Sequence, residues 1–215
     1  MFVCVFKVHW DHIGQPSDFP RSTFVVGHGS LGVLAGTATL RGGHSFFEAD
    51  LLDLERTVEL PDPAGNGGGG GMRDDLTSDS LSLSGPWEVI DGSPPVLDIF
   101  RDGSVYVVDA PGHLPGHVNL LVRVAEGDGK GGSRWVYLAG DACHDRRILR
   151  GEKEIGEWHD AAGHVCCIHA DRSKAEATIG RIRQLEENGV EVIFAHDVEW
   201  EADEGNRGRF FGAMS

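Results

Sequence analysis

The sequence predicts an α+β fold in which helices cover packed β-sheets. The chain opens with an apolar segment rich in Val and Phe at residues 2–8, which is typical of a buried strand. The middle of the chain has an antiparallel character, with strand-like segments at 87–90, 95–100, 104–109, 118–124 and 134–139. A helix at 173–188 then leads into another buried strand at 190–195.

The remaining elements are shorter. Residues 22–26 are expected to form a second strand, and residues 30–40 a short helix whose Gly and Thr content weakens it. Residues 45–60 show helical spacing first and strand-like alternation later. In the helix at 173–188, Ser173 with Glu176 three residues on matches a capping box, and Gly189 is the expected stop.

One domain with an insertion is the predicted organisation. A chain of 215 residues and 23.2 kDa fits a single domain, residues 1–215. Residues 61–86 are low in bulky apolar side chains and contain five consecutive glycines, so we expect a flexible surface insertion there. No Gly-Lys-Ser or Gly-Lys-Thr follows the glycines, which argues against a phosphate-binding loop.

The charge balance excludes some partners. Asp and Glu total 34 against 19 Lys and Arg, a formal charge of −15, so we expect neither nucleic acid nor an anionic membrane surface as a partner. No apolar run approaches the roughly 20 residues that span a bilayer. The four cysteines form no CxxC pair, and reduced thiols in a cytoplasmic protein are the expectation.

Four short segments carry the residues suited to bind metal. They are HWDH at 9–12, PGHLPGH at 111–117, Gly140-Asp141 and Ala195-His196-Asp197. Each follows a predicted strand or lies on a turn beside one, so these loops can meet at one edge of a sheet. Imidazole and carboxylate suit zinc, iron or manganese, and a carboxylate can bridge two such ions. The ordered set is far more specific than any one segment.

The segments HWDHIG, PGHLPGH, LAGD and FAHD, in this order, resemble the metallo-β-lactamase superfamily, and its lactonase-like hydrolases in particular. The resemblance runs from about residue 5 to residue 200, interrupted by the Gly-rich insertion. It implies a four-layer αββα sandwich with two metal ions, expected to be zinc, at one edge of its two sheets. It also implies six ligands: His9 and His117 at the first metal, Asp11, His12 and His196 at the second, and Asp141 as the bridge.

Further roles follow from the same resemblance. His113 is expected to serve the turn or to support the ligands without binding metal. His144 stands where lactonases of this family often carry a substrate-facing Tyr, so a catalytic hydrogen bond to a carbonyl oxygen is implied, with a solvated loop residue as the alternative. Asp11 would both bind metal and orient the attacking water. Trp10 is expected to pack under the metal loop.

The sequence departs from the family pattern in two ways. The motif HxHxDH has Lys7 in place of its first histidine, and an ammonium group offers no lone pair to a metal, so a weaker first site is expected. Only six residues precede Lys7, where the family has several strands, so we expect a sheet that lacks its N-terminal strands. The chain is then either an incomplete version of a longer protein or a divergent protein with one tightly held metal.

These features predict a metal-dependent hydrolase that opens a lactone or related ester, with N-acyl homoserine lactones as the leading small-molecule candidates. A thioester hydrolase of the glyoxalase II type would use the same ligands. The third alternative is a non-catalytic remnant that keeps the fold and holds metal weakly. The oligomeric state does not follow from the sequence.

Overall fold

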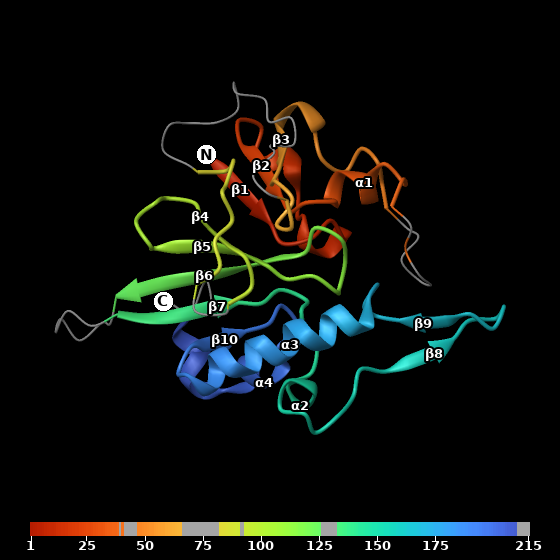
Figure 1. The fold of residues 1–215 in the computed structure, drawn as a ribbon, viewed down its shortest axis with the longest axis vertical. Helices are drawn as coiled ribbons and strands as arrows, with labels where there is room; N and C mark the ends of the chain where they lie inside the picture. Colours follow the sequence, from red (N-terminus) through yellow and green to blue (C-terminus); the bar gives the residue numbers. More distant parts are fainter. Residues whose placement is uncertain (39, 41–46, 66–81, 91–92, 126–132, 210–215) are drawn as a thin grey trace.

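The computed structural model describes residues 1–38, 40, 47–65, 82–90, 93–125 and 133–209. In this part of the chain the strands form three sheets (Figure 1). The first sheet is parallel, with the order β1 (Phe2–Val5), β2 (Thr23–Val26) and β3 (Thr57–Glu59).

The second sheet has five strands in the order β10-β7-β6-β5-β4. All neighbours are antiparallel except β10 and β7, which are parallel. The strands are β4 (Val96–Asp98), β5 (Val105–Asp109), β6 (Val118–Ala125), β7 (Ser133–Leu138) and β10 (Glu191–Ile193). The third sheet is the hairpin of β8 (Glu157–His159) and β9 (Val165–Cys167), which projects from the body of the molecule (Figure 1).

The α-helices are α1 (Ser30–Leu34), α2 (Arg146–Leu149), α3 (Arg172–Glu187) and α4 (Val198–Ala202). Short 3-10 turns occur at Trp10–His12, Pro16–Asp18, Leu54–Arg56 and Glu204–Arg209. None of the described helices is long and apolar enough to cross a membrane.

Alternating side chains on the strands establish four layers. Phe24 and Val26 of β2 pack with α1, whereas Val25 between them packs with Val107 and Val118 of the second sheet. On the far side of that sheet, Val108 and Tyr137 pack with Ile179 and Ile182 of α3. Because side chains alternate along a strand, each sheet has a face toward the other sheet and a face toward helices. The predicted α+β, four-layer αββα sandwich is confirmed.

Several predicted boundaries were wrong. The first strand ends at Val5, because residues 6–12 turn into the loop that carries His9 and Asp11. Residues 87–90 form only an isolated bridge through Glu88, and α1 ends at Leu34.

The long helix begins differently from the prediction. The cap of α3 is Asp171, whose carboxylate accepts from the Lys174 N–H, so Ser173 is not the cap. In the predicted insertion at 61–86, residues 66–81 lie outside the described residues. The single-domain organisation stays a prediction.

Candidate metal centre

The four segments meet at one edge of the sandwich because of the strand directions. Strands β5, β7 and β10 run parallel to one another, so the residues that follow them, 111–117, 140–144 and 194–197, leave the same edge. The loop after β1 joins them where the Val118 N–H donates to the Phe6 carbonyl oxygen at 2.9 Å. This convergence, predicted from the position of each segment at the end of a strand, places side chains far apart in sequence around one point.

Asp11, His12, Asp141 and His196 form the first donor group, which we call the four-donor group. From Asp141 Oδ1, His12 Nε2 lies 3.3 Å and His196 Nε2 lies 3.5 Å away. From Asp11 Oδ2, the same two nitrogens lie 3.5 and 3.6 Å away. Four ligands about 2.0–2.2 Å from a tetrahedral zinc ion are about 3.3–3.6 Å apart, so these donors fit such an ion.

His9, His113 and Asp141 form a second set, the three-donor group. His113 Nε2 lies 3.3 Å from His9 Nδ1 and 3.5 Å from Asp141 Oδ2. Lys7 enters this group. Its Nζ forms an ion pair with Asp141 Oδ2 and lies 3.0 Å from His113 Nε2, and its side chain is only 2% exposed. The three-donor group therefore contains a buried cationic side chain among its donors.

The two carboxylate oxygens of Asp141 face different neighbours. Oδ2 contacts Lys7, whereas the buried Oδ1 accepts no hydrogen bond from the described residues and faces His12 and His196. A buried carboxylate oxygen without a donor is costly unless a cation or water satisfies it. Oδ1 therefore points to a ligand within the four-donor group.

The structure exchanges the positions predicted for two histidines. His113, expected to support the turn, lies among the three donors. His117, predicted as a ligand, joins neither group of the described residues. Its Nδ1 lies 3.1 Å from the Ala110 carbonyl oxygen, and its Nε2 accepts from the Asp141 N–H at 3.2 Å, so backbone groups occupy both ring nitrogens.

Glycine geometry explains the placement of His113. Gly112 has a φ of +128°, and a Cβ there would overlap the backbone of Ala175 near the start of α3. The close approach lets the Asp171 and Ala170 N–H groups donate to the carbonyl oxygens of Gly112 and His113, both at 2.9 Å. These bonds fix the His113 backbone beside the site.

His144 and Trp10 also differ from expectation. His144 Nε2 lies 3.1 Å from Asp141 Oδ2, and its Nδ1 is buried without a hydrogen-bond partner among the described residues. The ring thus supports Asp141, and its predicted catalytic contact with substrate stays a prediction. Trp10 is 78% exposed, so the expectation that it packs under the loop was wrong. Its neighbours Asp11 and His12 turn inward and Trp10 turns outward.

His169 was missed by sequence reasoning. It is buried, and its ring lies edge-on to His113 and to His144, with centroids 5.3 and 5.7 Å apart. It precedes the N-terminus of α3, and no motif in the sequence marks it. Only the packing of the β9–α3 connection against the site places His169 there, and the sequence does not encode that packing locally.

Burial sets the protonation of the site. It lowers the pKa of His12 and, with help from Lys7, of His113, and it lowers the pKa of His117 to about 3. These rings are therefore neutral at pH 7, as metal binding requires. Burial alone raises the pKa of Asp141, but the hydrogen bond to His144 and the Lys7 ammonium outweigh it and hold this pKa below its usual range.

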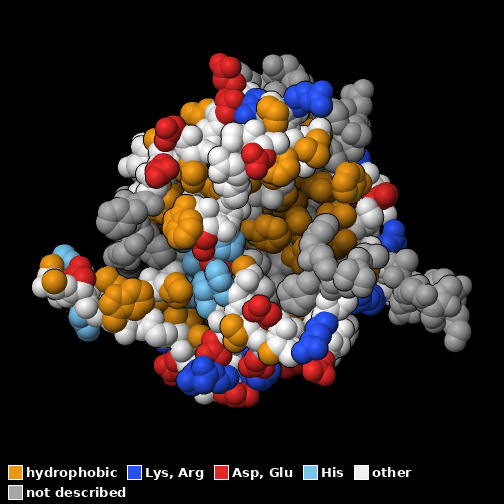
Figure 2. Space-filling model, turned by 180° about the vertical axis from the view of Figure 1, so that it is seen from behind, with side chains coloured by type: hydrophobic (Ala, Val, Ile, Leu, Met, Phe, Trp, Pro, Cys, Tyr) orange, Lys and Arg blue, Asp and Glu red, His pale blue; other side chains and the backbone are white. Residues whose placement is uncertain are grey.

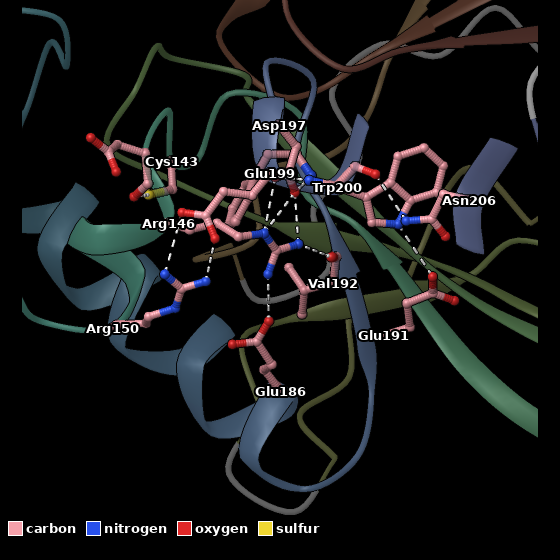
Figure 3. Close-up of polar contacts among 12 residues, drawn as sticks. Cys143, Arg146, Arg150, Glu186, Glu191, Val192, Asp197, Glu199, Trp200 and Asn206 are labelled. Carbon is pink, nitrogen blue, oxygen red and sulfur yellow. Dashed lines mark hydrogen bonds and ion pairs between the residues drawn. The ribbon is translucent and has the colours of Figure 1, made fainter. Parts of the chain in front are cut away.

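Arg146 ties two of the site loops together (Figure 3). Its guanidinium donates to both carboxylate oxygens of Asp197, with Nη2–Oδ2 at 2.7 Å, and to the Val192 carbonyl oxygen at 2.7 Å. It also pairs with Glu186 of α3 at 2.7 Å. Because Arg146 follows the Asp141 loop and Asp197 follows His196, this partly buried pair fixes one ligand loop against the other.

The surroundings of the site are partly open. Figure 2 shows histidine side chains gathered in the middle of one face, beside a hollow with hydrophobic side chains. A hollow of about 360 Å³ is lined by His144, His196 and Glu199 among others. A larger cleft of about 1200 Å³ lies between the β8–β9 hairpin, the start of α3 and the 111–117 loop, with His117 and His169 on its wall.

Several known proteins are similar to the chain in sequence. No family model matches it. It is 30% identical over 206 residues, 88% of its length, to cytochrome P450 monooxygenase mpaDE' of Penicillium brevicompactum, covering 21% of that protein. It is 32% identical over 143 residues, 66% of its length, to metallo-hydrolase mfmC of Annulohypoxylon moriforme, covering 30% of that protein. With gamma-lactamase FDB1 of Fusarium pseudograminearum it shares 29% over 138 residues, 63% of the chain and 27% of that protein.

Solved structures agree in fold. A quorum-quenching N-acyl homoserine lactone lactonase superposes with a TM-score of 0.55 at 17% identity, over 94% of this chain and 60% of that one. The chain has the metallo-β-lactamase fold, which it shares with these solved lactonases. A dizinc quorum-quenching lactonase, AidC, also shares the fold, with a TM-score of 0.50 at 12% identity, over 91% of this chain and 56% of that one.

The extent of the match limits what can be carried over to this chain. It spans about a fifth of the length of the first relative, 21%, and 56–60% of the two solved lactonases. At identities below 20% these structures establish the fold only. Activity is therefore argued from this chain's own residues.

Proposed function

We propose that the chain is a metal-dependent hydrolase that opens a lactone or related ester, with zinc held by Asp11, His12, Asp141 and His196. The observation that carries the proposal is the four-donor group, whose nitrogen–oxygen separations of 3.3–3.6 Å suit a tetrahedral ion. The names of relatives support a hydrolase, since they include a metallo-hydrolase and solved lactonases. N-acyl homoserine lactones are the first substrates to test.

A divalent ion in this group would polarise the carbonyl of a substrate and make a water acidic enough to attack it at neutral pH. Side chains of the site would position the water and the metal-binding carboxylate. Asp11 has a side chain 33% exposed, so it can hold and orient a water at the mouth of the site. His144 hydrogen-bonds Asp141 and keeps its carboxylate in place. The alkoxide released from the ring would take its proton from solvent.

The exposure of the donors supports access by a small molecule. His196 is half exposed, whereas Asp141 is 3% exposed beneath it. A carbonyl group can therefore approach from the His196 side while Asp141 anchors the ion from within. The 360 Å³ hollow beside His144 and His196 would receive the reacting part of the substrate.

A cyclic amide is the second candidate substrate. Gamma-lactamase FDB1 is among the relatives, and a lactam differs from a lactone only in its leaving group. A thioester of the glyoxalase II type belongs in the same assay because the same hydrolytic chemistry serves it. A remnant without activity would hydrolyse none of the three.

The test is hydrolysis by the purified chain loaded with zinc, compared with the same protein after chelation. We expect lactone opening that disappears on chelation and returns with zinc. Asp141→Ala should lose metal and activity together, because Asp141 belongs to both donor groups. Full activity in Asp141→Ala, or activity insensitive to chelation, would overturn the proposed site. Faster hydrolysis of the lactam or thioester would reassign the substrate.

A further inference from the structure

We infer that this chain holds one divalent ion, and that the Lys7 ammonium takes the place of the second ion of a dinuclear site. The inference rests on the proposed function in one respect, that the four-donor group holds metal. It goes beyond that function because it assigns the three-donor group a resident side chain in place of a metal.

The position of Lys7 is the first step. Its side chain is among the largest that the described core buries completely, and its Nζ reaches Asp141 Oδ2 and His113 Nε2. These two atoms are 3.5 Å apart, the separation of two ligands on one zinc ion. The Nζ therefore lies among the atoms that would bind an ion in this group.

Competition for those atoms is the second step. An ion held by His9, His113 and Asp141 would need bonds of about 2.0–2.2 Å to His113 Nε2 and Asp141 Oδ2. Nζ contacts both atoms already, so an added ion would overlap it. Two positive charges at that spacing also repel strongly in a site with little water. The ammonium and the ion are alternatives.

The division of Asp141 is the third step. One carboxylate oxygen faces the four-donor group without a hydrogen bond from the described residues, and the other contacts Lys7. In a two-metal site a bridging carboxylate can bind one ion through each oxygen. Here one oxygen of Asp141 faces the donors of the four-donor group and the other contacts the Lys7 ammonium. The solved lactonase AidC, by contrast, is described as a dizinc enzyme.

The buried Lys7 ammonium neutralises the negative charge of Asp141. A second divalent ion would bring two positive charges to Asp141, whereas Lys7 brings one. A buried lysine needs a partner carboxylate, and Asp141 is the acid that contacts it. Lys7 is therefore a positioning residue for Asp141, and the ion in the four-donor group is the only one that would touch substrate.

The experiment counts metal in the purified full chain after zinc loading and desalting, by elemental analysis, and follows Co²⁺ binding by its visible absorption. We expect about one ion per chain in the wild type and one phase of Co²⁺ titration. Lys7→His, which adds a ligand to the three-donor group, should raise the count to about two and add a second phase. Lys7→Met removes the competing ammonium and adds no imidazole, so His9, His113 and Asp141 should then bind a second ion more weakly than in Lys7→His.

Each outcome separates this inference from the proposed function. Two ions in the wild type would overturn the role of Lys7 and leave a hydrolase standing. No ion in the wild type, at saturating zinc, would overturn the proposed function itself. If Lys7→His does not fold by circular dichroism, the wild-type count still decides the matter. A Lys7→Met protein that binds no second ion at saturating zinc would show that the missing ligand, and not the ammonium, excludes the second metal, which contradicts the competition for donor atoms.

Discussion

The two donor groups share Asp141 and differ in what stands at their centre. In the four-donor group, His12, His196 and Asp11 surround a carboxylate oxygen that has no hydrogen bond from the described residues. In the three-donor group, the Lys7 ammonium contacts the other oxygen. In the proposed one-ion site, Lys7 replaces half of a two-metal site by an internal ion pair and leaves the donors of the other half open.

The groups also differ in burial. His196 is 50% exposed and Asp11 33%, whereas the side chains of His113 and Lys7 are each 2% exposed. Substrate and water can reach the first group, whereas in the second group His113 and Asp141 are buried and His9 is half-buried. The exposed group is therefore suited to chemistry, and the buried group to holding Asp141 in position.

Removing one histidine from each group gives the largest contrast. We expect His196→Ala to weaken zinc binding by about 100-fold or more, because it deletes a direct ligand and leaves three. His9→Ala should change zinc affinity by less than about 3-fold, because its group is occupied by Lys7. Competition with a chromophoric chelator measures both constants on the same protein preparation.

Equal losses in the two variants would erase the distinction between the groups. A loss in His9→Ala alone would place the ion in the three-donor group and expel Lys7 from it. Thermal unfolding of the chelated proteins provides the control, since neither substitution should alter the fold when metal is absent.

Arg146 tests how firmly the exposed group is held. Arg146→Gln removes the pair with Asp197 and frees the loop that carries His196, so we expect zinc affinity to fall about 10- to 100-fold. Arg150→Gln is the matched control. Arg150 pairs with Glu199 on the surface near the same helix, with both side chains more than 40% exposed, and we expect no measurable change.

The readout again is zinc affinity, together with the visible spectrum of the Co²⁺ form, which reports ligand geometry. A change confined to protein stability, with unaltered affinity and spectrum, would make Arg146 a purely structural residue. Loss of affinity in Arg150→Gln of the same size would show that surface charge, and not loop position, controls binding.

Much of the architecture was predictable from local patterns. The Val-rich strands and the helix at 173–188 follow from hydrophobic periodicity, and the four ligand segments follow from their order. The predicted strand boundaries were wrong next to the candidate site. The first strand ends at Val5 because the next residues turn to place His9 and Asp11 in the site. Short elements such as β8 and α4 carry too few residues for a periodic signal.

The assignment within PGHLPGH was not predictable. His113 and His117 have nearly the same sequence context, and their roles are separated by tertiary contacts. The Ala110 carbonyl oxygen and the Asp141 N–H occupy both nitrogens of His117, whereas the contact of Gly112 with α3 directs His113 inward. The contact of Lys7 with Asp141 is likewise a long-range event that no local pattern encodes.

A second carboxylate sharpens the role assigned to Lys7. Asp109 ends β5 and lines the large cleft, and burial raises its pKa to about 6 against the attraction of Arg181. Asp141 is also buried, yet its pKa is held low with the help of His144 and the Lys7 ammonium. The difference shows that a cation in contact with a partly or fully buried carboxylate lowers the pKa of that carboxylate.

The smallest predicted effect concerns this carboxylate and pH. The folded-state pKa of Asp109 is raised, so its share of stability is fully present below about pH 4 and is lost as pH rises from about 4 to about 6. At pH 7, Asp109→Asn should therefore raise the free energy of unfolding by about 1–2 kcal/mol, and at pH 4 it should change nothing. Urea unfolding of the chelated protein at both pH values measures the difference.

Asp102→Asn is the opposite control: Asp102 is exposed, and hydrogen bonds from Ser104 lower its pKa, so its substitution should not stabilise the protein at pH 7. Equal behaviour of the two variants would mean that Asp109 is hydrated in the cleft, and that burial alone does not separate it from Asp141.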